Sequence, residues 1–178
     1  MNAGKRFEND IKNSIPNGIL LYRLPDAAQS FGHNDNLRFS LKSPFDFLMW
    51  DSNSRSLYAL EMKSVQDKSI SFERTSEDRA VIHLHQIEGL KKWDEFAGTI
   101  CGFIIEFREI ETTIFLTISE FCKLADAISK KSFRIEDLQN NGITYYIIPQ
   151  KKKITHYSYD IDHFIQETKC LSDMRRKL

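Results

Sequence analysis

The sequence has few of the features that mark secreted, membrane-spanning or zinc-stabilised proteins. Its three cysteines, Cys101, Cys122 and Cys170, are odd in number and far apart. They fit neither a disulfide framework nor a zinc motif. No apolar run approaches the roughly 18 residues that can cross a membrane. Because the N-terminus is polar and charged, it also does not read as a signal peptide. We therefore expect a cytoplasmic protein with no membrane partner.

The chain also lacks an excess of either charge, with 25 Lys and Arg residues against 25 Asp and Glu residues. A nucleic-acid-binding protein usually has a basic footprint, so the balance counts modestly against such a partner. Basic residues do cluster locally, at positions 5–6, 91–92, 130–131, 151–153 and 175–177. Such clusters are usually solvated surface, and any of them could instead contact phosphate.

The 178 residues, 41% of them hydrophobic, are enough for one domain with a substantial core. We expect a single domain over residues 1–178, because there are no repeats and no low-complexity linker. Predicted helices cover residues 2–15, 83–96, 119–127, 135–139 and 160–170, the third capped by Ser119. Predicted strands cover residues 19–24, a hairpin within 43–64, and 99–107, 112–118 and 143–148. Residues 26–40 and 65–82 are expected to be loops. This order predicts an α/β fold with a mixed central sheet and flanking helices.

The hairpin within residues 43–64 contains three groups that do not belong in a plain apolar strand: Asp46, Glu61 and Lys63. Side chains alternate along a strand, so Glu61 and Lys63 share one face. A turn centred between Asn53 and Ser54 places Asp46 directly opposite Glu61. Two carboxylates so close repel each other unless a cation lies between them, and oxygen ligands suit Mg²⁺ or Mn²⁺. The arrangement suggests metal-assisted phosphodiester hydrolysis. A Glu-x-Lys pattern on a strand is nevertheless usually a solvated face.

Several motifs in order and spacing resemble a known family. Pro44-Phe45-Asp46 followed by Glu61-Met62-Lys63 resembles the PD-(D/E)xK nuclease signature. More specifically, the chain is similar to the RecU-type Holliday junction resolvases, including their phage-borne members. The resemblance extends over nearly the whole chain and includes residues 4–8, 22–26, 43–46, 59–64, 85–90 and 102–108. The family's long basic stalk has no obvious counterpart here except the polar segment 26–42.

The resemblance implies a restriction-endonuclease-like fold and a Mg²⁺-dependent homodimer that cuts four-way DNA junctions, leaving 5′-phosphate ends. Mn²⁺ is expected to substitute for Mg²⁺. The implied metal ligands are Asp46, Glu61, the backbone carbonyl of Met62, and Glu8. Lys63 would orient the attacking water or stabilise the transition state. Gln86, in the predicted helix 83–96, would hold a water or a phosphate.

The expected DNA contacts come mainly from basic side chains near these motifs. They are Lys5, Arg6, Arg23, Arg38, Lys42, Ser43, Ser64 and His85. Lys5 and Arg6 lie in the first turn of a predicted helix, whose dipole favours anions. A zinc site at His83 and His85 is rejected, because helical residues two apart face different directions.

Two other functions remain open from the sequence. The first is a different PD-(D/E)xK endonuclease that acts on linear or branched DNA. The second is a catalytically silent DNA-binding protein with the same fold. Retention of Asp46, Glu61 and Lys63 together argues against the silent protein, whereas only the substrate separates the two nucleases.

Overall fold

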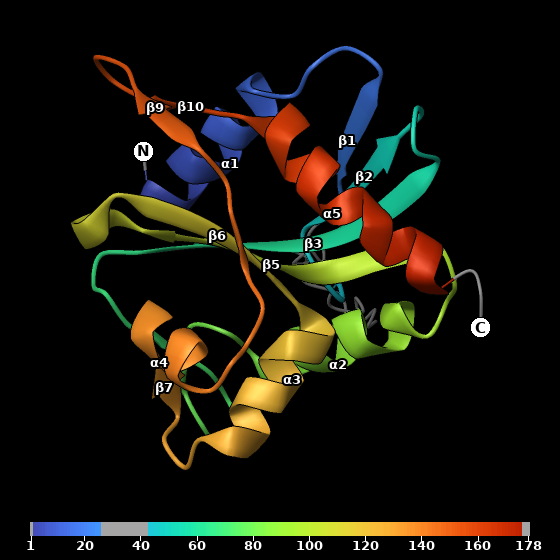
Figure 1. Ribbon diagram of the computed structural model, residues 1–178. Coiled ribbons are helices and arrows are strands. Elements are labelled where there is room, and N and C mark those ends of the chain that lie inside the picture. The colour runs from blue at the N-terminus through green and yellow to red at the C-terminus, as the bar shows by residue number, and fades with distance from the viewer. Residues whose placement is uncertain (1, 26–42, 176–178) are drawn as a thin grey trace, which may run out of the picture.

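The computed structural model describes residues 2–25 and 43–175, and its centre is a six-stranded mixed sheet (Figure 1). The strands lie in the order β1-β2-β3-β5-β6-β8. Their bounds are Ile19–Arg23 (β1), Phe47–Asp51 (β2), Ser56–Val65 (β3), Thr99–Phe107 (β5), Thr112–Thr117 (β6) and Tyr146–Ile147 (β8). Only β3 and β5 pair in parallel, and the other neighbours are antiparallel. The predicted α/β fold with a mixed central sheet flanked by helices is confirmed.

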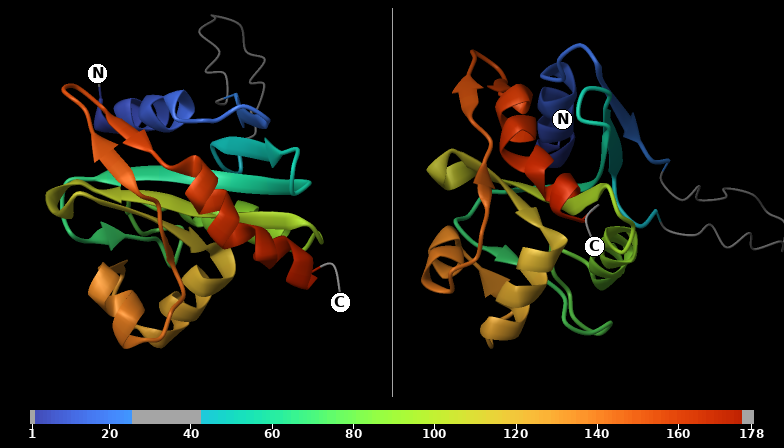
Figure 2. Two further views of the ribbon diagram at one scale, coloured as in Figure 1. Left: turned by 45° about the horizontal axis from the view of Figure 1, so that its top comes forward. Right: turned by 45° about the vertical axis from the view of Figure 1, so that its right-hand side comes forward.

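Helices cover both faces of this sheet (Figure 2). They are α1 (Ala3–Asn13), α2 (Leu84–Asp94), α3 (Ile118–Ala127), α4 (Ile135–Asn140) and α5 (Ile161–Arg175). Phe7 of α1 and Phe164 of α5 belong to the core on one face, whereas Leu90 of α2 and Phe121 of α3 belong to the core on the other. Phe7 and Ile11, one turn apart on α1, are both 1% exposed and pack into the core on this face. No helix in residues 2–25 and 43–175 is both long and apolar enough to span a membrane.

The helix α2 lies in the connection between β3 and β5. A parallel pair requires such a crossover, because a tight turn can join only antiparallel strands. The crossover covers the sheet face that carries the odd-numbered residues of β3, where Ala59 and Val65 join the α2 and α3 core. This topology brings the start of α2 close to Glu61.

Three local predictions differ from the structure. Residues 65–82, expected to be a loop, contain β4 (Ile70–Ser71), which pairs with β7 (Ser132–Phe133). The cap of α3 is Thr117 rather than Ser119, because Thr117 Oγ1 accepts from the Glu120 backbone N–H at 3.2 Å. A further antiparallel hairpin, β9 (Gln150–Lys152) and β10 (Tyr157–Tyr159), was not expected. Short strands of this kind depend on distant partners, which a local pattern does not reveal.

The predicted loop at 26–40 lies outside the described residues. Arg38 and Lys42 also lie outside the described residues, as does the whole segment 26–42 that was considered as a counterpart of the family's basic stalk. A short 3₁₀ helix, η1 (Arg108–Ile110), joins β5 to β6.

Candidate active site

The register of the β2–β3 hairpin brings Asp46 and Glu61 together. Phe47 pairs with Leu60, and the ladder continues to Asp51 and Ser56. Asp46 immediately precedes Phe47, and Glu61 immediately follows Leu60, so the two carboxyl groups occupy the next opposed position. The backbone N–H of Met62 donates to Asp46 Oδ2 at 3.2 Å, which fixes the aspartate against β3. The predicted register is therefore confirmed.

The turn of the hairpin holds this register through Asp51. Its carboxylate accepts hydrogen bonds from the backbone N–H groups of Asn53 at 3.0 Å and Ser54 at 3.1 Å. Arg55 then adopts a left-handed conformation with φ of 56°. Since a slip of one residue would turn every side chain of the strand to the other face, this turn keeps Glu61 on the same side as Asp46.

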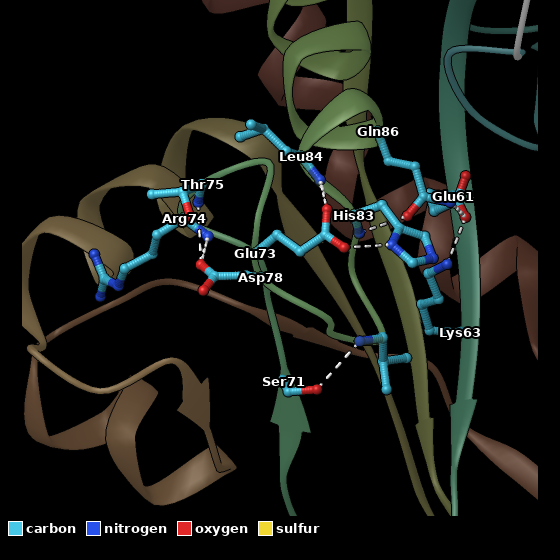
Figure 3. A network of polar contacts seen from close by, with 11 residues as sticks. Glu61, Lys63, Ser71, Glu73, Arg74, Thr75, Asp78, His83, Leu84 and Gln86 are labelled. Atoms are coloured by element: carbon cyan, nitrogen blue, oxygen red, sulfur yellow. Dashed lines mark hydrogen bonds and ion pairs between the residues drawn. The ribbon is translucent and has the colours of Figure 1, made fainter.

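Glu61 is 1% exposed, and its two carboxylate oxygens have different surroundings. Oε1 lies 2.9 Å from Nζ of Lys63 and also accepts a hydrogen bond from Nε2 of Gln86 (Figure 3). Oε2 is buried and has no hydrogen-bond partner among the described residues. A buried carboxylate oxygen without a partner is costly, so this oxygen is available for a ligand.

The protonation of Glu61 reflects this burial. The pKa of Glu61 is raised to about 8, mainly because burial removes solvent from the carboxylate; the charge of Lys63 opposes this rise, and the neighbouring charge of Asp46 adds to it. Without a further positive charge, the protein therefore favours the protonated acid near neutral pH. A cation placed beside Asp46 and Glu61 would restore the ionised form.

Gln86 is fixed in place by the start of α2. Its Oε1 accepts a hydrogen bond from the His83 backbone N–H at 2.9 Å, which leaves Nε2 directed at Glu61. Gly89, one turn later, sits against Pro44: a Cβ built on Gly89 would lie 2.6 Å from the Pro44 carbonyl oxygen. The absence of a side chain at this position lets α2 approach the segment that carries Asp46.

Glu73 anchors the same end of α2 from the far side (Figure 3). Its Oε1 lies 2.8 Å from Nδ1 of His83, and its Oε2 accepts from the Leu84 backbone N–H at 2.7 Å. These hydrogen bonds lower the pKa of Glu73, the contact with His83 having the largest effect. Sequence reasoning missed Glu73, because it lies in the segment expected to be a plain loop.

The donor set at this site fits Mg²⁺ or Mn²⁺. Two carboxyl groups, Asp46 and Glu61, are adjacent, although the described residues contain no cluster of three metal-ligating side chains. Mg²⁺ commonly uses only one or two carboxylates and completes its shell with water and substrate phosphate. The unpartnered Oε2 of Glu61 provides the observation that favours a cation here.

The other predicted residues divide between this site and its surroundings. Glu8 forms an ion pair with Arg23 (Oε2 to Nε 3.2 Å), and Arg23 pairs with Phe47 across β1 and β2, next to Asp46. Ser43 Oγ donates to the Pro25 carbonyl at 2.6 Å. His85 lies in the first turn of α2, where its ring stacks on that of His83.

Two of the expected DNA contacts, Ser64 and Arg6, lie away from the acidic pair, and a third, Lys5, is exposed to solvent. Ser64 Oγ donates to Glu106 Oε2 at 2.5 Å, on the opposite face of β3 from Glu61 and Lys63. Lys5 is exposed on the first turn of α1. Arg6, its neighbour, lines a separate cavity near the end of β3.

Comparison with known proteins places the chain in a family. The family described as "RecU: Recombination protein U" matches residues 56–163, more than half of the chain and including Glu61, Lys63 and Gln86. The chain belongs to the Recombination protein U family. Its resemblance to RecU-type resolvases, expected from the motifs, is thereby confirmed.

Two individual proteins resemble this RecU-family chain. One is the SPbeta prophage-derived uncharacterized protein YotM of Bacillus subtilis (strain 168), 28% identical over 132 residues. The match covers 73% of this chain and 63% of YotM, so it spans less than two thirds of that relative. The other is the solved structure of Hjc, a Holliday junction resolvase from Archaeoglobus fulgidus. It is 14% identical with a TM-score of 0.46, over 77% of this chain and 93% of Hjc.

Proposed function

We propose that this RecU-family protein is a Holliday junction resolvase, a Mg²⁺-dependent endodeoxyribonuclease that makes paired nicks in four-way DNA junctions. The observation that carries the proposal is the buried Glu61, which lies next to Asp46 and keeps one oxygen unpartnered while Lys63 and Gln86 hold the other. Family membership supports the same activity. We treat residues 1–178 as one nuclease domain.

Asp46, Glu61 and the backbone carbonyl of Met62 would hold the divalent ion, and Glu8 would support the site from its rim. A bound divalent ion lowers the pKa of water and offsets the negative charge that develops on the phosphate. Mn²⁺ has similar ligand preferences and would replace Mg²⁺.

Lys63 brings a positive charge to the face on which Asp46 and Glu61 lie. With its side chain 14% exposed and Nζ 2.9 Å from Glu61, the ammonium is held in place before substrate arrives. Preorganised charge of this kind stabilises a transition state more effectively than a mobile side chain. Lys63 would contact the reacting phosphate or orient the attacking water.

Gln86 has the second positioning role. Its amide is fixed by the His83 backbone and donates to Glu61, so it sets the direction of the carboxylate. Hydrolysis at this site would leave a 5′-phosphate and a 3′-hydroxyl, as the family resemblance implies.

A four-way junction requires two opposed nicks, and a homodimer with two-fold symmetry provides two equivalent sites. We therefore propose that the active form is a homodimer. Light scattering of the purified protein should give a mass of two chains, and a monomer that remains fully active would contradict this part of the proposal.

The test of function is cleavage of a synthetic four-way junction beside a linear duplex of the same sequence, with Mg²⁺ and with EDTA. A resolvase will nick only the junction, at symmetric positions, and only with Mg²⁺. Equal cleavage of both substrates would favour a general PD-(D/E)xK endonuclease. Salt-sensitive binding without any cleavage would favour the catalytically silent DNA-binding protein.

A further inference from the structure

A cation-lined cavity of about 350 Å³ lies at one end of the molecule, outside the acidic site. Its wall comes from α1, the end of β3, η1 and the β9–β10 hairpin, elements that lie together in both views (Figures 1 and 2). The lining side chains include four that carry a positive charge, Arg6, Arg108, Lys152 and Lys153, and one carboxylate, Glu111. A chain with no net charge therefore concentrates positive charge at this place.

Two of these cations have unsatisfied groups. Nε of Arg6 and Nε of Arg108 are buried and have no hydrogen-bond partner among the described residues. A guanidinium stays charged in proteins and can only donate, so each buried N–H requires an acceptor oxygen. Glu111 does not provide it: neither Nε has a partner, and the Oε1 atom of Glu111 contacts Lys152 Nζ at 2.5 Å and the Tyr157 hydroxyl at 3.0 Å instead.

The cavity lies near the end of β3, beside α1 and therefore on the face of the sheet opposite to Glu61 and Lys63. Gln66, which lines the cavity, follows Lys63 by three residues. At about 3.3 Å per residue, the separation along the strand is about 10 Å. A four-way junction extends well beyond the phosphate that reacts at Lys63, so another of its backbone phosphates can reach the cavity past the end of β3.

We propose that this cavity binds a backbone phosphate of the DNA substrate, through Arg6, Arg108 and Lys153. The inference rests on the proposed function, because it takes DNA as the ligand. Arginine is well suited to this contact, since its planar fork matches phosphate oxygens. The β9–β10 hairpin and η1 thereby become part of the DNA-binding surface. Of the residues that line the cavity, only Arg6 was among the expected DNA contacts, although the basic run at 151–153 was noted as a possible phosphate contact.

The experiment measures how strongly the affinity for a four-way junction depends on salt, with Ca²⁺ in place of Mg²⁺ to limit cleavage. Each phosphate contact contributes about 0.9 to the slope of log affinity against log salt. We expect Lys153→Gln and Arg108→Gln each to reduce this slope by up to about 0.9 and to raise the Kd several-fold. Lys153 is exposed, so its substitution tests the site without disturbing the core.

Two further variants give the matched comparison. Lys12→Gln removes the same charge from the last turn of α1, at the end opposite Arg6, and should leave the slope unchanged. Glu111→Gln removes the carboxylate of the cavity and should lower the Kd. Melting temperatures of all four variants confirm that each is folded.

The outcomes separate this inference from the proposed function. If the wild-type protein cuts the junction but Lys153→Gln and Arg108→Gln keep the wild-type salt slope, the phosphate site is wrong and the nuclease stands. An equal loss of slope in Lys12→Gln would also overturn the phosphate site, because the loss would then reflect the net charge of the protein and not a contact in the cavity. A reduced slope without any cleavage would support the phosphate site and contradict the nuclease.

Discussion

Nζ of Lys63 lies 2.9 Å from Oε1 of Glu61, and both side chains are largely removed from solvent. The pair is built into one strand, because residues two apart on β3 share a face. Lys63 therefore has two effects, which are to limit the rise in the pKa of Glu61 and to supply a fixed positive charge beside Asp46.

A substitution of Lys63 tests these two effects without disturbing the fold. Lys63→Met keeps most of the side-chain length but removes the charge, so we expect single-turnover cleavage to fall by about 10²–10³-fold. Affinity for the junction should change by less than tenfold, because one cation among many contacts is lost. Quenched-flow cleavage and fluorescence anisotropy measure the two quantities. A cleavage rate within threefold of wild type would contradict a role for Lys63 in the reaction.

Asp46→Asn keeps the shape of a proposed metal ligand and removes its charge. Cleavage with Mg²⁺ should become undetectable, whereas DNA binding should be nearly intact, because less negative charge repels the phosphate. The Met62 N–H can still donate to the remaining carbonyl oxygen, so the melting temperature should stay close to that of wild type. Loss of the fold or of DNA binding in this variant would count against the assignment of the site.

A substitution at Gly89 tests how closely α2 must approach the segment that carries Asp46. Alanine is the better helix former by about 1 kcal/mol, but its Cβ would lie 2.6 Å from the backbone oxygen of Pro44. Because backbone cannot move cheaply, we expect Gly89→Ala to destabilise the protein by about 1–2 kcal/mol net and to slow cleavage at least tenfold.

The matched control for that substitution is Gly4→Ala. Gly4 is also helical, and an added Cβ would meet only Asn2 Oδ1 at an ordinary 3.5 Å. This variant should be as stable as wild type or slightly more so. If Gly89→Ala behaves in the same way in thermal unfolding and in cleavage, the close contact of α2 with Pro44 has no importance for the site.

The raised pKa of Glu61 predicts how the metal-free protein responds to pH. A carboxyl group with a folded-state pKa of about 8, above its ordinary value of 4.5, stabilises the fold most below the lower of these two values. That stability is lost as pH rises from about 4.5 through about 8. In EDTA the melting temperature should therefore fall over this range, more steeply than it does for Glu61→Gln. Identical pH profiles of the two proteins would contradict the burial of an ionisable Glu61.

The sequence predicted the hairpin and its register because short-range effects determine both. The turn around Asn53 and the alternation of residues 58–62 fix which residues face each other, and Asp46 and Glu61 then meet without any tertiary information. The strand at 99–107 was equally clear, because nearly all of its residues are apolar.

The supports of the site could not be predicted in the same way. The contact of Gly89 with Pro44 and that of Glu73 with His83 depend on how α2 packs on the sheet. The cation-lined cavity joins Arg6 to Lys153 across most of the chain, and the only local signal was the basic run at 151–153. Such arrangements depend on tertiary packing, and the periodicity of a sequence carries no information about it.

The most direct test is the binding of Mn²⁺, followed by electron paramagnetic resonance at pH 8, to the wild-type protein, Asp46→Asn and Glu111→Gln. If Asp46 and Glu61 hold the divalent ion, wild type and Glu111→Gln will bind Mn²⁺ with the same affinity. Asp46→Asn will bind it at least 10-fold more weakly, because one of two charged ligands is gone. Equal Mn²⁺ affinity in Asp46→Asn and wild type would contradict the acidic pair as the metal site.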